Sequence, residues 1–439
     1  MLKMGCAKAD VTPDFPVYQQ GYGFRNRKTA AVADRLETGV IALEQDGQRM
    51  LLITADMVGI TVEECGRISG RIETDFGIGA RELIVSCSHT HFAPAFSAYV
   101  VAVPGGELAP DIYPGDERYF EFWYAQTRDA VRRALDDLEE VSLESVAIPV
   151  SGISFNRRTV RKSDGMVKTN YVLPEDLDAY HFSPVDPEFL VWRFMRGNEV
   201  KAMLGRFSCH PVTGDKAPYE ISADYPGVLK QVIAGEYGCP GFFLLGTAGD
   251  AVPMKRGLRA RKYIGEILGR MIHMNELRFR PEPEFRLAVK SFTVPGILKR
   301  VMESGDPEAR WRKARETARD LRADDFDAYL KFRDEACGYL VTRRFGKKEF
   351  DIPIRLVRFG GRVLVCLPFE VLTDIGSELR AACPEAVIIS VAGGYEGYLG
   401  LEADFKKGGY ETDIGADFLP DTGDRILAAC IDAVREFSR

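Results

Sequence analysis

The chain has 439 residues, of which 46% are hydrophobic and 28% charged, a balance typical of globular proteins that bury a large core. Its net charge is −7 and it has no long basic block, so a nucleic-acid partner is excluded. No apolar stretch reaches the roughly 18 residues that a membrane span needs, which excludes an integral membrane protein.

The cysteines and the N-terminus both indicate a cytoplasmic protein. The nine cysteines are an odd number, include no Cys-x-x-Cys pair, and several lie within apolar runs, as reduced core cysteines do. Met1–Cys6 lacks the basic and then apolar pattern of a secretory signal. We therefore do not expect a zinc–thiolate site.

Apolar runs separated by turn residues predict strands and helices along the whole chain. The expected strands are 39–44, 50–54, 83–85, 143–150, 189–195, 200–208, 241–245, 285–294, 351–359, 362–367 and 386–391. The expected helices are 61–76, 117–140, one that opens at 221–227 and runs to about 236, 258–277 and 424–437, together with a charged amphipathic helical insertion at 303–336. Since no linker interrupts this order, we expect a single elaborated α/β domain over 1–439, with mixed β-sheets, flanking helices and a metal site at strand ends.

The expected strand 83–85 runs into Ser-His-Thr-His-Phe-Ala-Pro, which contains His89 and His91, two of only five histidines. Side chains at i and i+2 of a strand share a face, so two imidazoles placed in this way can meet at one point. Taken alone, the pair fits a surface turn without a ligand equally well. Its meaning depends on whether other polar side chains follow strands in the same manner.

Other expected strands do end in polar residues. The residues concerned are Asp56, Arg157, His210, Asp250, Glu370, Tyr395 and Tyr398. Strand ends of an α/β layer gather such groups in one crevice. Nitrogen and oxygen ligands without thiolate suit zinc, and a catalytic zinc ion uses about three protein ligands and keeps a position open for water. Asp56 also fits a helix cap before 61–76, and we favour capping or indirect support over direct ligation.

Several short motifs occur in a fixed order: Ala-Asp-Val-Thr-Pro, Ser-His-Thr-His-Phe-Ala-Pro, Phe-Asn-Arg, Cys-His-Pro-Val-Thr, Gly-x-Ala-Gly-Asp, Pro-x-Glu, Gly-Tyr-x-x-Tyr and Gly-Gly-Tyr-Glu. Together they resemble the neutral/alkaline (non-lysosomal) ceramidase family, which are zinc-dependent amidases that cleave the N-acyl bond of ceramide. The resemblance runs from about residue 5 to the C-terminus.

The resemblance implies a role for each residue. One catalytic zinc ion, with a second ion possible, would be bound by His89, His210, Glu370 and Tyr398, with Tyr395 as the alternative tyrosine. His91, Arg157 and Tyr398 would carry the catalysis: zinc activates water, a neighbouring histidine moves the proton, and an arginine stabilises the oxyanion. Asn156 and Tyr395 would contact the substrate, and Asp56, Asp224 and Asp250 would orient the ligands.

The chain also departs from the family. Val252 stands where ceramidases carry a serine that has been suggested as nucleophile, which excludes serine acylation from this position and leaves attack by zinc-bound water. The chain stops where the catalytic domain of the long ceramidases stops, before their C-terminal β-sandwich, and no exposed apolar helix suited to taking up a membrane lipid is evident. A smaller soluble amide therefore fits as well as a sphingolipid. A metal-binding homologue without catalysis, and a metallohydrolase of esters or lactones, are the alternatives.

Overall fold

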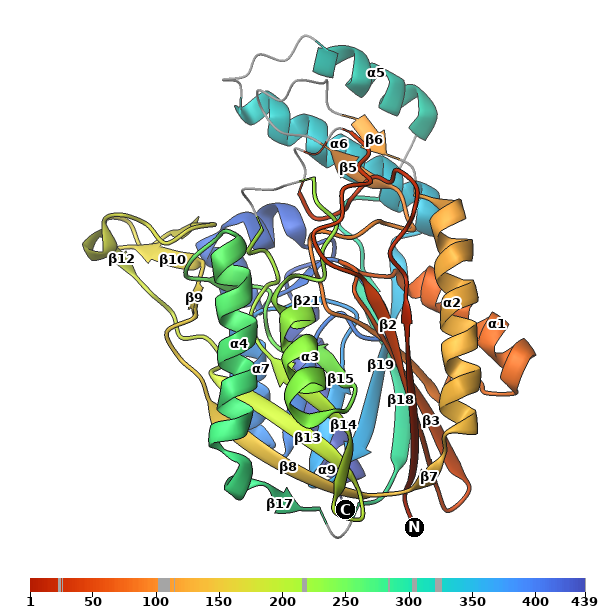
Figure 1. Ribbon diagram of the computed structural model, residues 1–439. Helices are drawn as coiled ribbons and strands as arrows, with labels where there is room; N and C mark the ends of the chain where they lie inside the picture. The colour runs from red at the N-terminus through yellow and green to blue at the C-terminus, as the bar shows by residue number, and fades with distance from the viewer. Residues whose placement is uncertain are drawn as a thin grey trace.

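The computed structural model describes residues 1–22, 25, 27–101, 111–113, 115–214, 219–282, 285–301, 306–319 and 326–438. Three larger sheets form two layers at the centre, and helices cover both outer faces (Figure 1). Mixed sheets with flanking helices are what the sequence predicted, and the fold class is confirmed.

The first sheet has the order β4-β3-β2-β1-β7. Its strands are β1 Lys3–Asp10, β2 Glu37–Gln45, β3 Gln48–Ala55, β4 Leu83–Cys87 and β7 Glu139–Glu140. The β2–β3 hairpin turns at Asp46 and Gly47, which have φ of 49° and 79° as the Asp-Gly turn requires, and β4 pairs parallel to β3. Strand β1 was not predicted, because its sequence KMGCAKAD shows only a weak apolar alternation.

The second sheet continues this layer with the order β15-β14-β13-β8-β17, and the third packs against the first two. The second contains β8 Ser142–Pro149, β13 Glu188–Arg196, β14 Glu199–Phe207, β15 Gly241–Leu245 and β17 Arg280–Pro281. The third contains β18 Ala288–Ile297, β19 Glu349–Phe359, β20 Arg362–Cys366 and β22 Ala386–Ile389, in this order. Trp192 and Phe359 meet edge to face between the two layers, with ring centroids 5.2 Å apart.

Helices close both outer faces. One core cluster joins the first two sheets to α1 Val62–Phe76, α2 Glu117–Asp136, α3 Asp224–Tyr237 and α4 Leu258–Met274. Another joins the third sheet to α7 Thr373–Ala382 and α9 Thr422–Phe437. Short elements complete the chain: α8 Glu402–Lys407, two 3-10 turns at Leu177–Ala179 and Glu276–Arg278, and a π-helical turn at Glu411–Gly415.

Four small sheets surround the strand ends. They are β5 Tyr99–Val101 with β6 Asp111–Tyr113; β9 Ser154–Asn156 with β16 Ala251–Pro253; β21 Glu370–Val371 with β23 Tyr398–Leu399; and a projecting arm made of β10 Arg158–Arg161, β11 Val167–Thr169 and β12 Tyr180–His181. None of these was expected, because two- to four-residue strands leave too short a pattern in the sequence.

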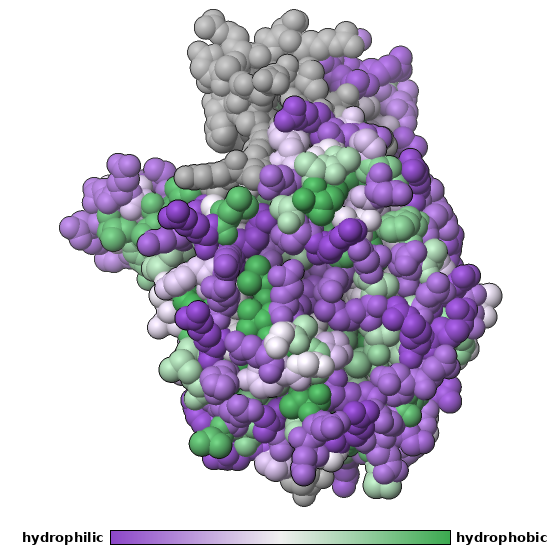
Figure 2. All heavy atoms as spheres, viewed as in Figure 1, coloured by the Kyte–Doolittle hydropathy of each residue, from purple (hydrophilic) through white to green (hydrophobic). Residues whose placement is uncertain are grey.

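Two helices, α5 Pro307–Arg319 and α6 Phe326–Phe345, lie where the insertion 303–336 was expected. They sit together beyond the strand ends (Figure 1), and residues 303–305 and 320–325 of that stretch lie outside the described residues. Among the described helices, none is long and apolar enough to cross a membrane. The surface in Figure 2 is mainly hydrophilic, with hydrophobic residues in small separate groups.

The segment after β22 holds the layers together at one end. The amide of Ser390 donates to the carbonyl of Leu245 (2.9 Å) at the end of β15, and the amide of Cys87 at the end of β4 donates to the carbonyl of Val391 (3.0 Å). The ends of strands from all three large sheets are thereby brought to one place. The polar residues that follow these strands meet there.

Candidate metal centre

His89 and His91 lie in a turn beyond the end of β4, and not on the strand itself. His89 has φ of 68°, a left-handed conformation that is uncommon for a residue other than glycine. Its amide donates to the carbonyl of Met57 (2.8 Å), which fixes the turn over the end of β3. The argument from side chains that alternate along a strand is therefore wrong for this pair: the turn, and not the strand, brings the two imidazoles together.

Three imidazoles meet in this turn. Nε2 of His89 is 3.1 Å from Nε2 of His210, which follows β14, and 3.3 Å from Nε2 of His91. His89, His91 and His210 form a buried group that could hold a metal ion. Burial lowers the pKa of His210 to about 4 and that of His91 well below its ordinary value, so both rings are neutral at pH 7.

Backbone carbonyls fix the tautomers of two of these rings. Nδ1 of His89 donates to the carbonyl of Val58 (2.6 Å), and Nδ1 of His210 donates to the carbonyl of Ala248. A carbonyl oxygen only accepts, so each of these rings carries a proton on Nδ1 and turns Nε2 toward the other imidazoles. This arrangement is typical of histidines that bind a metal through Nε2.

Glu370 adds an oxygen to the same point. Its Oε2 is 3.1 Å from Nε2 of His89 and 3.0 Å from Nε2 of His210, while Oε1 accepts a hydrogen bond from the hydroxyl of Tyr395 (2.7 Å). When Nε2 of both rings is unprotonated, two lone pairs and a carboxylate oxygen face one another, an arrangement that a cation stabilises. Nitrogen and oxygen donors of this kind suit zinc.

His91 differs from the other two histidines in its surroundings. It alone of the three lines a cavity of about 870 Å³, and its Nδ1 is buried without a hydrogen-bond partner. Gly21, with φ of 108°, packs against the ring: a Cβ at this position would come within 2.5 Å of Cγ of His91. Only glycine fits here, and it holds the His91 ring at the cavity wall.

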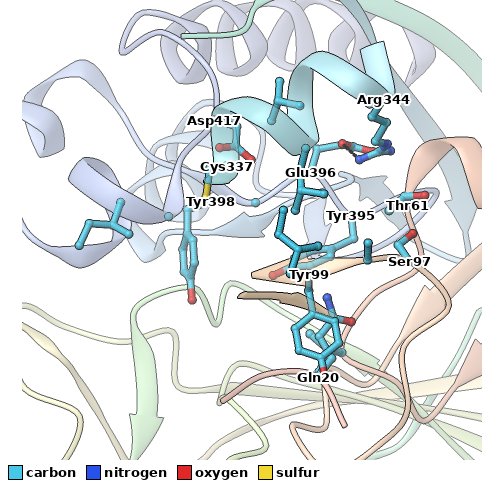
Figure 3. A pocket seen from close by; sticks show the side chains of 18 of the residues that line it. Gln20, Thr61, Ser97, Tyr99, Cys337, Arg344, Tyr395, Glu396, Tyr398 and Asp417 are labelled. Atoms are coloured by element: carbon cyan, nitrogen blue, oxygen red, sulfur yellow. Dashed lines mark hydrogen bonds and ion pairs between the residues drawn. The ribbon is translucent and has the colours of Figure 1, made fainter. Parts of the chain in front are cut away.

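The cavity extends from the imidazoles to the helices α5 and α6. Glu370, His91, Tyr395 and Tyr398 line it near the candidate metal centre, and Trp311 and other α5–α6 residues line it farther out. Figure 3 shows Tyr395, Tyr398, Tyr99 and Gln20 around this space. A substrate molecule of moderate size could therefore reach the histidines.

Arg157 is buried beside the cavity and reaches it through a tyrosine. Its Nη2 donates to the hydroxyl of Tyr398 (2.8 Å) and to the carbonyl of Gly249 (2.9 Å), and its Nε donates to Oε1 of Glu411 (2.6 Å). Of this group, only Tyr398 is among the described residues that line the cavity. Arg157 therefore polarises the hydroxyl of Tyr398, and Tyr398 rather than Arg157 lines the cavity.

Asn156 and Asp250 bind each other behind the centre. Nδ2 of Asn156 donates to Oδ2 of Asp250 (2.8 Å), and Oδ1 of Asp250 accepts from the amide and the hydroxyl of Thr373 (3.0 and 2.6 Å). Burial raises the pKa of Asp250 to about 6. These contacts tie β9 to the start of α7. We expected Asp250 to orient an imidazole, but the carbonyl of Ala248 fixes the ring of His210 instead.

Asp56 and Asp224 also lie outside the imidazole group. Asp56 accepts from the ammonium of Lys230 (2.6 Å) and from the amide of Glu37 (2.9 Å), whereas Asp224 accepts from the amide and hydroxyl of Thr213 (2.9 and 2.8 Å). Asp56 does not cap α1; its N-cap is Thr61, in a capping box with Glu64. Both aspartates stabilise the strand-to-helix connections that carry the site.

Glu411 was missed by the sequence analysis, although it is fully buried and binds two arginines. Its Oε1 accepts from Arg157, and its Oε2 accepts from Nη1 of Arg158 (3.2 Å) and from the hydroxyl of Thr169 (3.0 Å). The motif Gly-Gly-Tyr-Glu pointed to this position without indicating a partner. A contact between residues this far apart in the chain leaves no local pattern.

The fold and the histidine group thus define an α/β protein with a buried candidate metal centre beneath a large cavity. The chain matches the crystal structure of a neutral ceramidase from Pseudomonas aeruginosa with a TM-score of 0.69 and 16% identity, covering 100% of this chain and 75% of that one. It matches the structure of a ceramidase complexed with C2 with a TM-score of 0.71 at the same identity and coverage. No family model and no curated protein matches the sequence. The chain therefore has a neutral-ceramidase-like fold.

Proposed function

We propose that this protein is a zinc-dependent hydrolase that cleaves an amide C–N bond. The observation that carries the proposal is the group formed by His89, His210 and Glu370, whose donor atoms meet at 3.0–3.1 Å beside a cavity that admits a substrate. The likeness of the fold to solved ceramidases supports the same reaction class.

In this proposal His89, His210 and Glu370 hold the ion, and Tyr398 is the further ligand that the sequence resemblance implies. A bound zinc ion supplies a Lewis acid that polarises a carbonyl and lowers the pKa of water. The carbonyls of Val58 and Ala248 keep both ligand rings in the tautomer that presents Nε2. The hydroxyl of Tyr395 orients the Glu370 carboxylate through Oε1.

His91 is assigned to the substrate, because it lines the cavity and no backbone carbonyl fixes its Nδ1. In this role the neutral ring takes a proton from the attacking water and passes it to the leaving amine. Arg157, through the hydroxyl of Tyr398, stabilises negative charge on the carbonyl oxygen as the bond breaks. The cavity also limits which amides can reach these groups, and we propose a small soluble amide as a substrate class alongside a sphingolipid.

One feature favours the alternative of a metal-binding protein without catalysis. Val252 is fully buried in β16 and packs with Phe155 and Val212 in an apolar cluster. It cannot act as a nucleophile, so any catalysis must rely on water.

The test is turnover by the purified protein of a panel of N-acyl amines, esters and lactones, before and after zinc is removed by a chelator and restored. Amide hydrolysis that disappears with zinc and returns on its addition is expected, together with its loss in H89A and E370A. Metal-dependent turnover that persists in both variants contradicts the proposal. Turnover of esters or lactones alone, or of nothing while zinc stays bound, supports the respective alternative.

A further inference from the structure

The helices α5 and α6 form the part of the cavity wall that lies farthest from the histidines. They pack on each other through the stacked rings of Trp311 and Tyr339, whose centroids are 5.4 Å apart at an interplanar angle of 14°. Trp311, Tyr339 and Arg344 all line the cavity. We call this helix pair, Pro307–Arg319 with Phe326–Phe345, the cap.

An ion pair joins the cap to the tyrosine-bearing segment Gly393–Leu399. Nη1 and Nη2 of Arg344, near the end of α6, donate to Oε2 and Oε1 of Glu396 at 2.7 and 2.6 Å (Figure 3). The side chain of Glu396 is 3% exposed and that of Arg344 is 23% exposed, so the carboxylate side of this bidentate pair is shielded from water. A shielded two-bond contact fixes the orientation of both partners more firmly than an exposed pair does.

The same carboxylate also binds a third segment. Oε1 of Glu396 accepts a hydrogen bond from the amide of Val62 (2.8 Å), the first residue of α1. An anion at this position is stabilised by the unpaired amides and the dipole of the helix N-terminus. Glu396 therefore holds the cap, the start of α1 and the segment Gly393–Leu399 in one arrangement.

The segment needs such a support because its own backbone is permissive. Gly393 and Gly397 have φ of 73° and 83°, conformations that glycine adopts without strain. Glu396 lies between Tyr395, which binds Glu370, and Tyr398, which binds Arg157. We therefore expect a movement of Glu396 to disturb Tyr395 beside it and Tyr398, which the pairing of β23 with β21 also holds.

We propose that Arg344 is a positioning residue, which holds Tyr395 and Tyr398 in place through Glu396. Both tyrosines then keep their positions in the site only while the cap is bound to Glu396. The inference deepens the proposed hydrolase function, but its structural part does not require that function. According to this inference, the cap both lines the cavity and keeps the two tyrosines of the site in position.

The test is hydrogen–deuterium exchange of the full chain as purified, followed in the peptide that contains residues 393–399. In R344Q we expect at least tenfold faster exchange of this peptide and of the peptide at the start of α1. The isosteric variant E396Q should show the same change. R344K, which keeps the charge but not the two-pronged contact, should lie between R344Q and the wild type.

R310Q is the matched control, because Arg310 joins α5 to α6 through Glu335 (2.7 Å) without contacting residues 393–399. It should leave exchange of that peptide unchanged. Equal acceleration in R310Q and R344Q, or unchanged exchange in R344Q and E396Q, overturns the inference.

Kinetics separate this inference from the proposed function. With a substrate that the wild type hydrolyses, R344Q should lower kcat at least tenfold and change KM less than threefold, since the tyrosines are displaced while most of the cavity remains. Faster exchange in a protein that hydrolyses nothing would refute the hydrolase and leave the positioning role supported. Unaltered kcat in R344Q would refute the positioning role and leave the hydrolase supported.

Discussion

Nε2 of His89 and Nε2 of His210 face each other at 3.1 Å while the opposite nitrogen of each ring donates to a backbone carbonyl. Two lone pairs at this distance repel each other unless a cation lies next to them. The backbone carbonyls therefore hold both rings in the orientation that a metal ion needs. The repulsion between the two Nε2 lone pairs is replaced by attraction to the ion when the ion binds.

Removing the metal should lower the stability of the protein. An ion present at a thousand times its Kd stabilises the folded state by about 4 kcal/mol. We expect dialysis against a zinc chelator to lower Tm, and added zinc to restore it, by differential scanning calorimetry. H210A should lack this response, so an equal loss of Tm in H210A on chelation would contradict the assignment.

Replacing His91 should separate metal binding from catalysis. H91A removes the ring that lines the cavity and leaves His89, His210 and Glu370 in place. We expect zinc content to stay near that of the wild type and the rate of amide hydrolysis to fall about 10²- to 10⁴-fold. His273, which is 71% exposed on α4, provides the control: H273A should alter neither quantity. Zinc lost together with the rate in H91A would identify His91 as a ligand.

Removing the hydroxyl of Tyr395 should weaken zinc binding. This hydroxyl donates to Oε1 of Glu370 (2.7 Å), and the loss of such a supporting hydrogen bond typically lowers metal affinity about 10- to 100-fold. Competition with a chromogenic chelator measures this change in Y395F. Y237F is a suitable control, because the hydroxyl of Tyr237 on α3 has no hydrogen-bond partner. Equal affinities for Y395F and the wild type would argue against this role.

Glu411 should contribute strongly to folding stability. E411Q would remove the carboxylate that contacts both Arg157 and Arg158, and breaking a buried ion pair typically costs about 3–5 kcal/mol. Urea unfolding measures the loss. The exposed pair of Arg71 and Glu121 offers a comparison, since E121Q should cost about 1 kcal/mol or less. A loss in E411Q no larger than that in E121Q would show that the buried pair is dispensable.

Asp250 should make stability depend on pH between about 4 and 6. Its pKa is 3.8 in the ordinary state and about 6 when buried in the folded chain, so the folded state binds the proton more tightly. The stability that this proton provides is fully present below the unfolded pKa and is lost as pH rises through the folded one. An asparagine does not titrate, so from pH 4 to pH 7 the wild type should lose about 2 kcal/mol relative to D250N. If the unfolding free energies of the wild type and D250N changed by the same amount between pH 4 and pH 7, the expectation would be contradicted.

Much of the fold could be predicted from the sequence, because long strands and helices carry a strong local pattern. The Asp46–Gly47 hairpin and helix α2 are examples: one depends on turn residues and the other on apolar residues at helical spacing. The short strands and β1 could not be predicted, because their pairing is fixed by neighbours far along the chain.

The site was also predicted in part, because some of its residues follow strands that have a strong local pattern. Histidines and a carboxylate that follow apolar strands indicated that His89, His91, His210 and Glu370 would meet, and the structure brings them together. The left-handed turn at His89, and Glu396 as the partner of Arg344, left no signal in the sequence. Both depend on tertiary contacts that only the folded chain supplies.

The most direct measurement is anomalous X-ray diffraction at the zinc absorption edge from crystals of the purified protein. The account predicts one strong peak within coordination distance of Nε2 of His89, Nε2 of His210 and Oε2 of Glu370, next to the cavity wall formed by His91. A crystal grown with zinc that shows no peak at this position would contradict the central claim.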